Sequence, residues 1–152
     1  MQELGFNYRM TDIQAALGHS QMKKITRFIR RRTQIANYYI KAFSRNKRLT
    51  TLPIFSDRTS AWHLFPIQVV QKKRKEIFTA LHKSHIKVQV HYIPVHLHPY
   101  YKKRFGYKKG DFPNAETFYN QEISLPIYPE LTDAQVSFVV RVVASLTEKL
   151  SS

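Results

Sequence analysis

The feature that most restricts the fold is a helix start that the sequence fixes at one residue, Thr11. The Thr11 hydroxyl can accept a hydrogen bond from the backbone of Gln14, and the Gln14 side chain can bond back to the Thr11 N–H. Asp12 follows in the first turn, where the helix dipole favours negative charge. Small and medium apolar side chains then recur at helical spacing: Ile13, Ala16, Leu17 and Met22. The pattern predicts a helix that packs closely against another element.

The residues ahead of this helix start predict a loop that could bind an anion. Gly5 permits a turn with unusual dihedral angles, while Asn7 and Arg9 add an amide and a guanidinium beside free backbone N–H groups. The alternative is a local turn bond for Asn7 and a solvated surface charge for Arg9. The residues alone leave both readings open.

A longer helical pattern covers residues 20 to 46, with Gly18 as the expected kink after the first helix. Its apolar positions recur at three- and four-residue steps: Ile25, Phe28, Ile29, Ala36, Tyr39 and Phe43. Arginine and lysine side chains fall on the other faces.

Two strands with a helix between them follow. Residues 61 to 70 are rich in β-branched and aromatic side chains and predict a strand with Pro66 at an edge or a bulge. Residues 72 to 84 return to helical spacing, and residues 86 to 92 alternate as a second strand.

The C-terminal third predicts two further helices around a short edge strand. Pro113 suits the first turn of a helix, and residues 122 to 129 contain prolines that an edge strand tolerates. Thr132 and Gln135 repeat the capping box before a final helix. Its apolar stripe is Val136, Val139, Val140, Val143, Leu146 and Leu150.

These elements predict an α+β fold, a small antiparallel or mixed sheet packed by helices on one side and preceded by a long helix. A chain of 152 residues with 43% hydrophobic content is long enough for a real core. We expect residues 1–46 to form a contact loop and long helix, and residues 47–152 a small α/β domain.

A second polar stretch, residues 88 to 101, carries His91, His96 and His98, with His82 and His85 shortly before. A zinc site is one reading, but no cysteine or carboxylate lies at a recognisable spacing. Structural packing and bonds to the backbone are a second. The third is a polar ligand rim after a strand, built from Tyr92, His96 and Tyr100.

Composition narrows the class of protein. No apolar run approaches the roughly 18 residues of a membrane span, the start lacks a secretory signal, and the chain has no cysteine, which together favour the cytoplasm. Lys and Arg number 25 against 10 Asp and Glu, which indicates a negatively charged partner. A nucleic-acid or polyanion-binding module is therefore an alternative function, although the basic clusters are scattered among apolar segments and no RNP, KH or zinc-finger motif is present.

The run GFNYRMTDIQAALG, residues 5–18, resembles the segment that opens the C-terminal part of DegT/DnrJ/StrS-type aminotransferases. Later segments match the same family in order, namely HYIPVHLHPYY at 91–101, DFPNAE at 111–116, SLPIYP at 124–129 and LTDAQ at 131–135. The resemblance covers essentially the whole chain. Residues 6–18 and 88–101 are also similar in wording to members that serve the pseudaminic acid pathway.

The resemblance implies a homodimeric enzyme that uses pyridoxal 5'-phosphate to move an amino group from glutamate to a UDP-linked keto sugar. It implies that Asn7 and Arg9 lie on a loop that reaches the cofactor phosphate in the neighbouring subunit. It also implies that Tyr92, His96 and Tyr100 contribute to the sugar-nucleotide pocket. Family members often carry a glutamine at the position of His98, so the role of His98 is left open.

The family's Schiff-base lysine and the acid that protonates the cofactor ring lie upstream of the segment that resembles residues 5–18. No lysine here has the family's Schiff-base context. The resemblance therefore implies that this chain is the C-terminal portion of a longer enzyme, with no catalytic residue of its own and with no activity alone. An exposed apolar patch on the first two helices is expected where the missing domain and a second subunit would pack.

Overall fold

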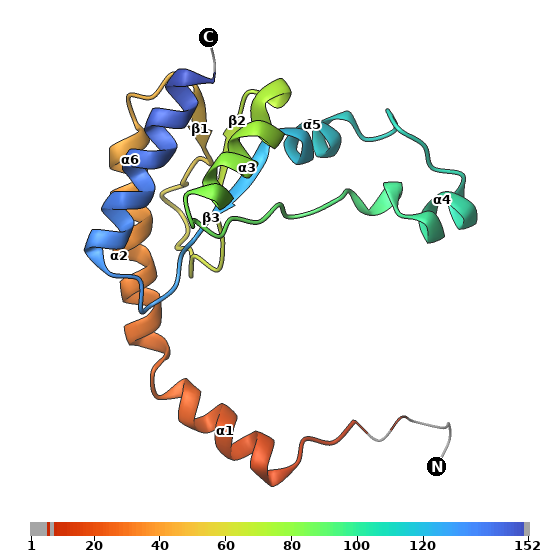
Figure 1. Cartoon of the computed structure of the whole chain (residues 1–152). Helices are drawn as coiled ribbons and strands as arrows, with labels where there is room; N and C mark the ends of the chain where they lie inside the picture. The colour runs from red at the N-terminus through yellow and green to blue at the C-terminus, as the bar shows by residue number, and fades with distance from the viewer. Residues whose placement is uncertain (1–5, 7, 151–152) are drawn as a thin grey trace.

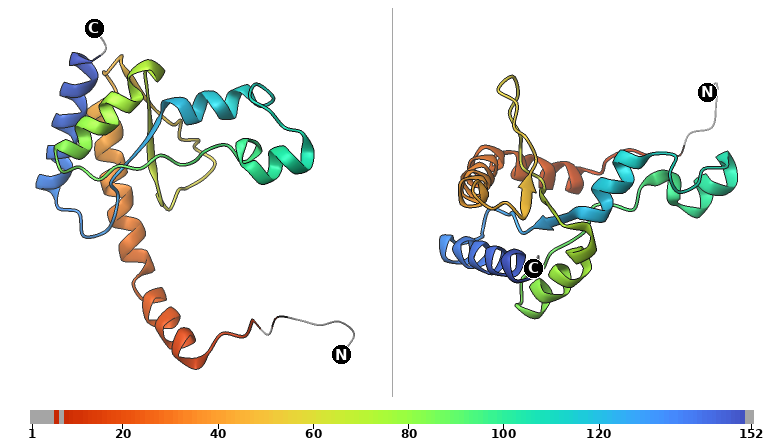
Figure 2. Two further views of the ribbon diagram at one scale, coloured as in Figure 1. Left: turned by 45° about the vertical axis from the view of Figure 1, so that its right-hand side comes forward. Right: turned by 90° about the horizontal axis from the view of Figure 1, so that it is seen from above.

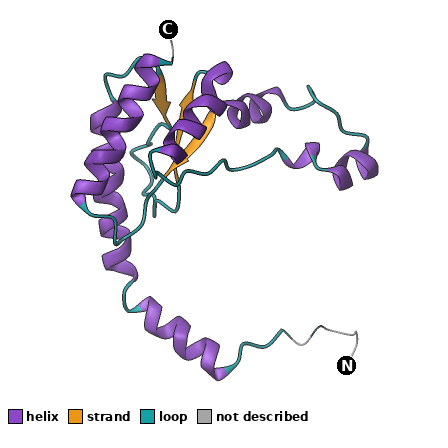
Figure 3. Cartoon of the chain, in the orientation of Figure 1, coloured by secondary structure: helices purple, strands orange, loops and turns teal. Residues whose placement is uncertain are grey.

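The computed structural model describes residue 6 and residues 8–150. These residues form six α-helices, two short 3-10 helices and three strands (Figures 1 and 3). In chain order they are α1 (Asp12–Met22), α2 (Ile25–Phe43), β1 (Leu49–Thr51), β2 (Phe65–Val69), η1 (Gln71–Lys73), α3 (Arg74–Lys83), η2 (Val95–Leu97), α4 (Pro99–Phe105), α5 (Pro113–Gln121), β3 (Glu122–Leu125) and α6 (Asp133–Lys149).

The first helix begins as predicted, whereas the second begins at Ile25 and not at residue 20. Thr11 caps α1 through two reciprocal hydrogen bonds with Gln14. The Gln14 N–H donates to the Thr11 hydroxyl at 3.3 Å, and the Thr11 N–H donates to Gln14 Oε1 at 2.9 Å. The expected kink at Gly18 is wrong, because Gly18 stays within α1 and the chain breaks at Lys23 and Lys24. A single glycine inside a helix costs only about 1 kcal/mol, which the flanking turns can absorb. The second helix ends at Phe43 and not at residue 46.

The sheet has three antiparallel strands in the order β1-β2-β3. Leu49 pairs with Val69, and Phe65 pairs with Leu125. The prediction of an edge position for Pro66 is wrong for the strand as a whole, since β2 is central. Pairing with β1 nevertheless stops at Ile67, so Pro66 has a paired neighbour only on the β3 side, opposite Ser124. The sheet therefore tolerates the missing N–H.

The predicted strand over residues 86 to 92 is also wrong. Burial alternates as expected, with Ile86 and Val88 inside, but the segment makes only an isolated bridge between Gln89 and Ser124. Two residues on, the His91 N–H bonds to the side chain of Glu122 and not to a backbone carbonyl. A side chain thus takes the place where the ladder would continue.

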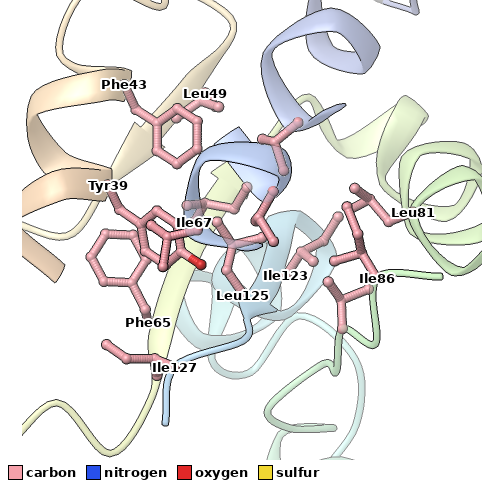
Figure 4. Close-up of a cluster of buried hydrophobic side chains, with 14 of the residues drawn as sticks. Tyr39, Phe43, Leu49, Phe65, Ile67, Leu81, Ile86, Ile123, Leu125 and Ile127 are labelled. Atoms are coloured by element: carbon pink, nitrogen blue, oxygen red, sulfur yellow. The ribbon is translucent and has the colours of Figure 1, made fainter. Parts of the chain in front are cut away.

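The core lies between the sheet and the helices (Figure 4). Tyr39 and Phe65 pack with ring centroids 5.0 Å apart. Ile67 from the central strand β2 and Ile123 from β3 belong to the same buried cluster. The final helix buries Val136, Val139 and Val143, as its predicted stripe requires. Seen from above, α6 and α3 lie on one side of the sheet, and α2 lies beside α6 next to β1 (Figure 2, right). The α+β architecture is thereby confirmed.

Two segments extend away from this core (Figure 1). One is α1 with residue 6 and residues 8–11 before it, and no residue of α1 is buried. The other, which we call the arm, comprises residues 93–112 with η2 and α4, and returns to the sheet through α5. Gly106 closes α4 in the left-handed conformation, with φ of 74°, which few other residues adopt at low cost.

Candidate site at the arm and the N-terminal loop

The interior of the arm is organised by His96, which is only 7% exposed. Its Nε2 lies 2.9 Å from Oε1 of Glu116, and the Gly110 N–H donates to the same carboxylate at 2.7 Å. The ring of Phe112 packs on His96 with centroids 4.8 Å apart. The Gly110 N–H first, and His96 second, hold the pKa of Glu116 below its ordinary value.

Beside His96 the arm is hollowed by an open, mostly apolar cavity of about 510 Å³. Its walls come from both limbs of the arm and from the start of α5: Pro94, Val95, His96, Tyr101, Phe105, Tyr107, Phe112 and Ala115. The polar side chains in this lining are His96, Tyr101 and Tyr107, and none of them is cationic by nature as lysine and arginine are, so the cavity suits an apolar or aromatic group more than a phosphate.

The other predicted rim residues lie on the outside of this region. The side chains of Tyr92 and Tyr100 are 69% and 67% exposed, so both phenols are free to meet a ligand. His98 is also exposed, and its Nε2 lies 3.1 Å from the Ile93 carbonyl. The structure thus separates His96, which faces the arm interior, from the two tyrosines that face outward.

A polar cluster that sequence reasoning missed lies where the chain leaves the sheet for the arm. His91 Nδ1 is 2.9 Å from the Ser124 hydroxyl, which donates to Oε1 of Glu122 at 2.5 Å. The His91 N–H donates to Oε2 of Glu122 at 2.8 Å. Glu122 and Ser124 are two residues apart on β3, a spacing that places polar side chains on one face and was visible in the sequence. Their partner His91, on another segment of the chain, could not be identified from the sequence.

The predicted anion loop is described only in part. Asn7 and Gly5 lie outside the described residues. Arg9 is exposed, and Phe6 and Tyr8 stack with ring centroids 5.5 Å apart while remaining 84% and 90% exposed. A cation and two aromatic rings therefore stand in solvent just ahead of the helix start.

The lysines of this chain do not fit the covalent attachment of a pyridoxal cofactor. All lie in the described residues, and all but Lys73 are exposed. Lys73 is half-buried and pairs with Glu76 at 3.2 Å. A cofactor lysine works inside a pocket with its pyridine-binding acid, and these surface positions provide neither. Of the residues that were expected at the cofactor, Arg9 is exposed just ahead of α1.

Two of the three arginines in the cluster 30–32 serve the fold and not a basic patch. Arg31 donates to the Leu131 carbonyl and pairs with Asp133 at 2.8 Å. Arg32 donates to backbone carbonyls on two distant segments. The charge excess therefore overstates the cationic surface that is free for a polyanion.

Among residues 6 and 8–150, no three histidine or acidic side chains are grouped as metal binding would require. Within the same residues, no helix combines the length and apolarity needed to cross a bilayer.

The fold is shared with solved aminotransferases. The structure of PseC from Helicobacter pylori, an aminotransferase involved in the biosynthesis of pseudoaminic acid, superposes with a TM-score of 0.89 at 35% identity, over 97% of this chain and 40% of that one. In sequence, the chain is 43% identical over 149 residues to the spore coat polysaccharide biosynthesis protein SpsC of Bacillus subtilis, covering 95% of this chain and 38% of SpsC. It is 37% identical to the UDP-4-amino-4,6-dideoxy-N-acetyl-beta-L-altrosamine transaminase of Campylobacter jejuni, over 99% of this chain and 40% of that enzyme.

The chain thus spans about two fifths of the length of these relatives. Residues 1–144 match the sequence pattern of one family. Together with the shared fold, this match shows that the chain belongs to the DegT/DnrJ/EryC1/StrS aminotransferase family.

Proposed function

We propose that this chain is the C-terminal part of a pyridoxal-phosphate-dependent aminotransferase that transfers an amino group from glutamate to a UDP-linked 4-keto-6-deoxy sugar. The complete enzyme is a cytoplasmic homodimer that makes amino sugars for surface glycans. The chain alone is inactive because it has no lysine placed to hold the cofactor.

The observation that carries the proposal is the family match over residues 1–144, which begins at the loop and α1. That region has no buried residue in α1 and exposes Phe6, Tyr8 and Arg9. These side chains are therefore available to contact another domain or another subunit. The substrate class rests on the altrosamine transaminase of Campylobacter jejuni and on PseC. Because the chain is more similar to SpsC, at 43% identity, than to the altrosamine transaminase, at 37%, we propose a class of sugar and not one particular sugar.

The candidate residues divide into two groups. Asn7 and Arg9 bind the cofactor phosphate in the neighbouring subunit, through an amide donor and a guanidinium. The cofactor, when bound, supplies the electron sink for amino transfer. Tyr92 and Tyr100 line the sugar-nucleotide pocket with their exposed phenols, and His96 supports this rim from behind by fixing the arm through Glu116.

The test compares the chain alone with a chimera in which residues 1–150 replace the matching segment of the Campylobacter jejuni transaminase. We expect the 152-residue chain to leave the absorption spectrum of pyridoxal phosphate unchanged and to show no transfer from glutamate to the UDP-keto sugar. The chimera should shift the absorption spectrum of pyridoxal phosphate and should transfer the amino group to the UDP-keto sugar, because the Campylobacter jejuni part supplies the lysine and its acid.

A chimera in which residues 1–150 are replaced by a flexible linker serves as the control and should be inactive. Turnover by the chain alone would contradict the proposal, as would a folded chimera that binds the cofactor but does not transaminate.

A further inference from the structure

The chain leaves helix α3 through His85, in a conformation that favours glycine. The His85 N–H donates to the His82 carbonyl and the Ile86 N–H donates to the Leu81 carbonyl, both at 3.0 Å. This is the Schellman pattern, whose left-handed position is usually filled by glycine. His85 stands there with φ of 59°, although a Cβ makes this conformation unfavourable. The closure of the helix therefore does not require an imidazole at this position.

The His85 side chain instead lines a cavity of about 450 Å³ between the end of α3, the connection after β3 and the first turns of α6. The buried part of the lining is aliphatic, and two exposed aromatic rings add to it. The full lining is His85, Ile86, Lys87, Pro126, Tyr128, Leu131, Gln135, Phe138 and Val139. A cavity of this size and composition accommodates a small organic molecule.

The polar groups of this lining are mainly hydrogen-bond donors. Gln135 Oε1 accepts from the Thr132 N–H at 2.9 Å and from the Thr132 hydroxyl at 3.1 Å, so the amide nitrogen of Gln135 remains as a donor. Lys87 is exposed, and within the described chain its ammonium pairs with no carboxylate. The His85 ring carries an N–H in either tautomer.

Acidic side chains are directed away from the cavity. Among the described residues, no aspartate or glutamate lines it. The two acids on the connection into α6 lie toward α2, since Asp133 pairs with Arg31 at 2.8 Å and Glu130 lines a separate cavity with Arg30. The donors of the first cavity are therefore not neutralised by the protein itself.

We propose that this cavity binds a small organic monoanion, a carboxylate with an aromatic or branched apolar body. The carboxylate accepts from His85, Lys87 and Gln135, and the body lies against the aliphatic lining. One permanent positive charge matches a carboxylate better than a phosphate, which carries close to two negative charges. The cavity lies beside α6, remote from α4 and the arm (Figure 1), so the proposal is independent of the proposed function.

The test uses the 152-residue chain and 3-phenylpropionate as the probe, titrated by saturation-transfer difference NMR. We expect saturable binding. Two analogues separate the two halves of the probe, because 3-phenylpropan-1-ol keeps the ring without the charge and acetate keeps the charge without the ring. Each should bind at least roughly threefold more weakly than 3-phenylpropionate, the equivalent of one lost interaction.

Two substitutions test the assigned residues. His85→Gly should weaken binding of 3-phenylpropionate by roughly three- to tenfold, while the melting temperature stays the same or rises because glycine relieves the left-handed strain. Lys87→Met keeps most of the apolar stem, removes the charge and should weaken binding by at least as much. The matched control is Lys83→Met, the same change at an exposed lysine of α3 that does not line the cavity, which should leave the Kd within about twofold.

The absence of saturable binding would overturn the proposal, as would equal affinity for 3-phenylpropionate and 3-phenylpropan-1-ol. A Kd unchanged in both His85→Gly and Lys87→Met would place the probe elsewhere, for example in the arm. A lower melting temperature of His85→Gly would assign the imidazole to the fold and not to a ligand. None of these measurements needs transaminase activity, so an inactive chimera would refute the proposed function and leave this assignment to its own test.

Discussion

At the scale of single residues, Arg32 shows a cation that serves as internal structure. Its Nη1 lies 2.9 Å from the Trp62 carbonyl, 3.2 Å from that of His63 and 2.8 Å from that of Ile127. Trp62 has a φ of 52°, which is uncommon for a bulky residue and costs energy. One guanidinium thus joins the segment before β2 to the segment after β3 and satisfies carbonyls that the sheet does not reach.

We expect Arg32→Ala to lower the free energy of unfolding by about 2 kcal/mol, because half-buried carbonyls lose a charged donor. Arg32→Lys should restore only part of it, since the flexible stem of lysine does not hold its ammonium at the fixed position that the rigid guanidinium plane gives Nη1. Urea denaturation checks both. Arg30→Ala, at the exposed neighbour on the same helix, is the matched control and should change stability by less than about 0.5 kcal/mol. Equal losses at the two positions would refute the role of Arg32.

At the scale of elements, the arm folds around the pair of His96 and Glu116 and not around an aliphatic core. The carboxylate joins the two limbs, because it receives the Gly110 N–H from one limb and His96 Nε2 from the other. The aromatic rings of Tyr107 and Phe112 complete the interior, with centroids 5.5 Å apart. The arm therefore depends on the ionised carboxylate.

The pKa of Glu116 is held below its ordinary value in the folded chain, first by the Gly110 N–H and then by His96. A depressed folded pKa stabilises the arm above the unfolded pKa, about 4.3, and this stability is lost as pH falls through the folded pKa. The protection factor of the Gly110 amide, which is the exchange rate corrected for the intrinsic effect of pH, should therefore fall in acid before the protection factors of α6 do. In Glu116→Gln, the protection factor of Gly110 should be low at neutral pH and nearly independent of pH. Equal acid sensitivity in the variant would exclude Glu116 as the cause.

The elements also show what the sequence could predict. Both capping boxes, the α6 stripe and the helix over residues 74–83 were predictable because the bonds and periodicities involved are local. The absence of a strand at 86–92 was not predictable, because it depends on the distant side chain of Glu122, which accepts a hydrogen bond from the His91 N–H. For the same reason the sequence identified His96 but could not show that it faces Glu116, twenty residues on.

At the scale of the whole molecule, an apolar surface on α1 and the start of α2 has no partner in the described chain. Ile13 and Leu17, one turn apart on α1, are 76% and 62% exposed, and Ile25 and Ile29, one turn apart on α2, are 41% and 37% exposed. Apolar side chains are thus exposed on both helices, where an apolar patch was expected. Surfaces of this kind mark sites of association.

We expect the isolated chain to self-associate at micromolar concentration, and Leu17→Glu to shift it toward the monomer in analytical ultracentrifugation. His19→Glu introduces the same charge at an exposed position on the other side of α1 and should change association less. A monomer at all concentrations in the unmodified chain would contradict this expectation, and equal effects of the two variants would place the contact elsewhere.

The exposed position of α1 has a thermodynamic consequence. A helix of 11 residues without a buried side chain is shorter than the roughly 12 to 15 residues at which isolated helices become even marginally stable in water. The capping box at Thr11 offsets part of the nucleation cost but adds no tertiary contact. In the proposed homodimer, docking of α1 would be linked to its coil-to-helix ordering, so a substitution that raises α1 helicity in the free chain without touching the docked face should tighten docking by up to the same free energy.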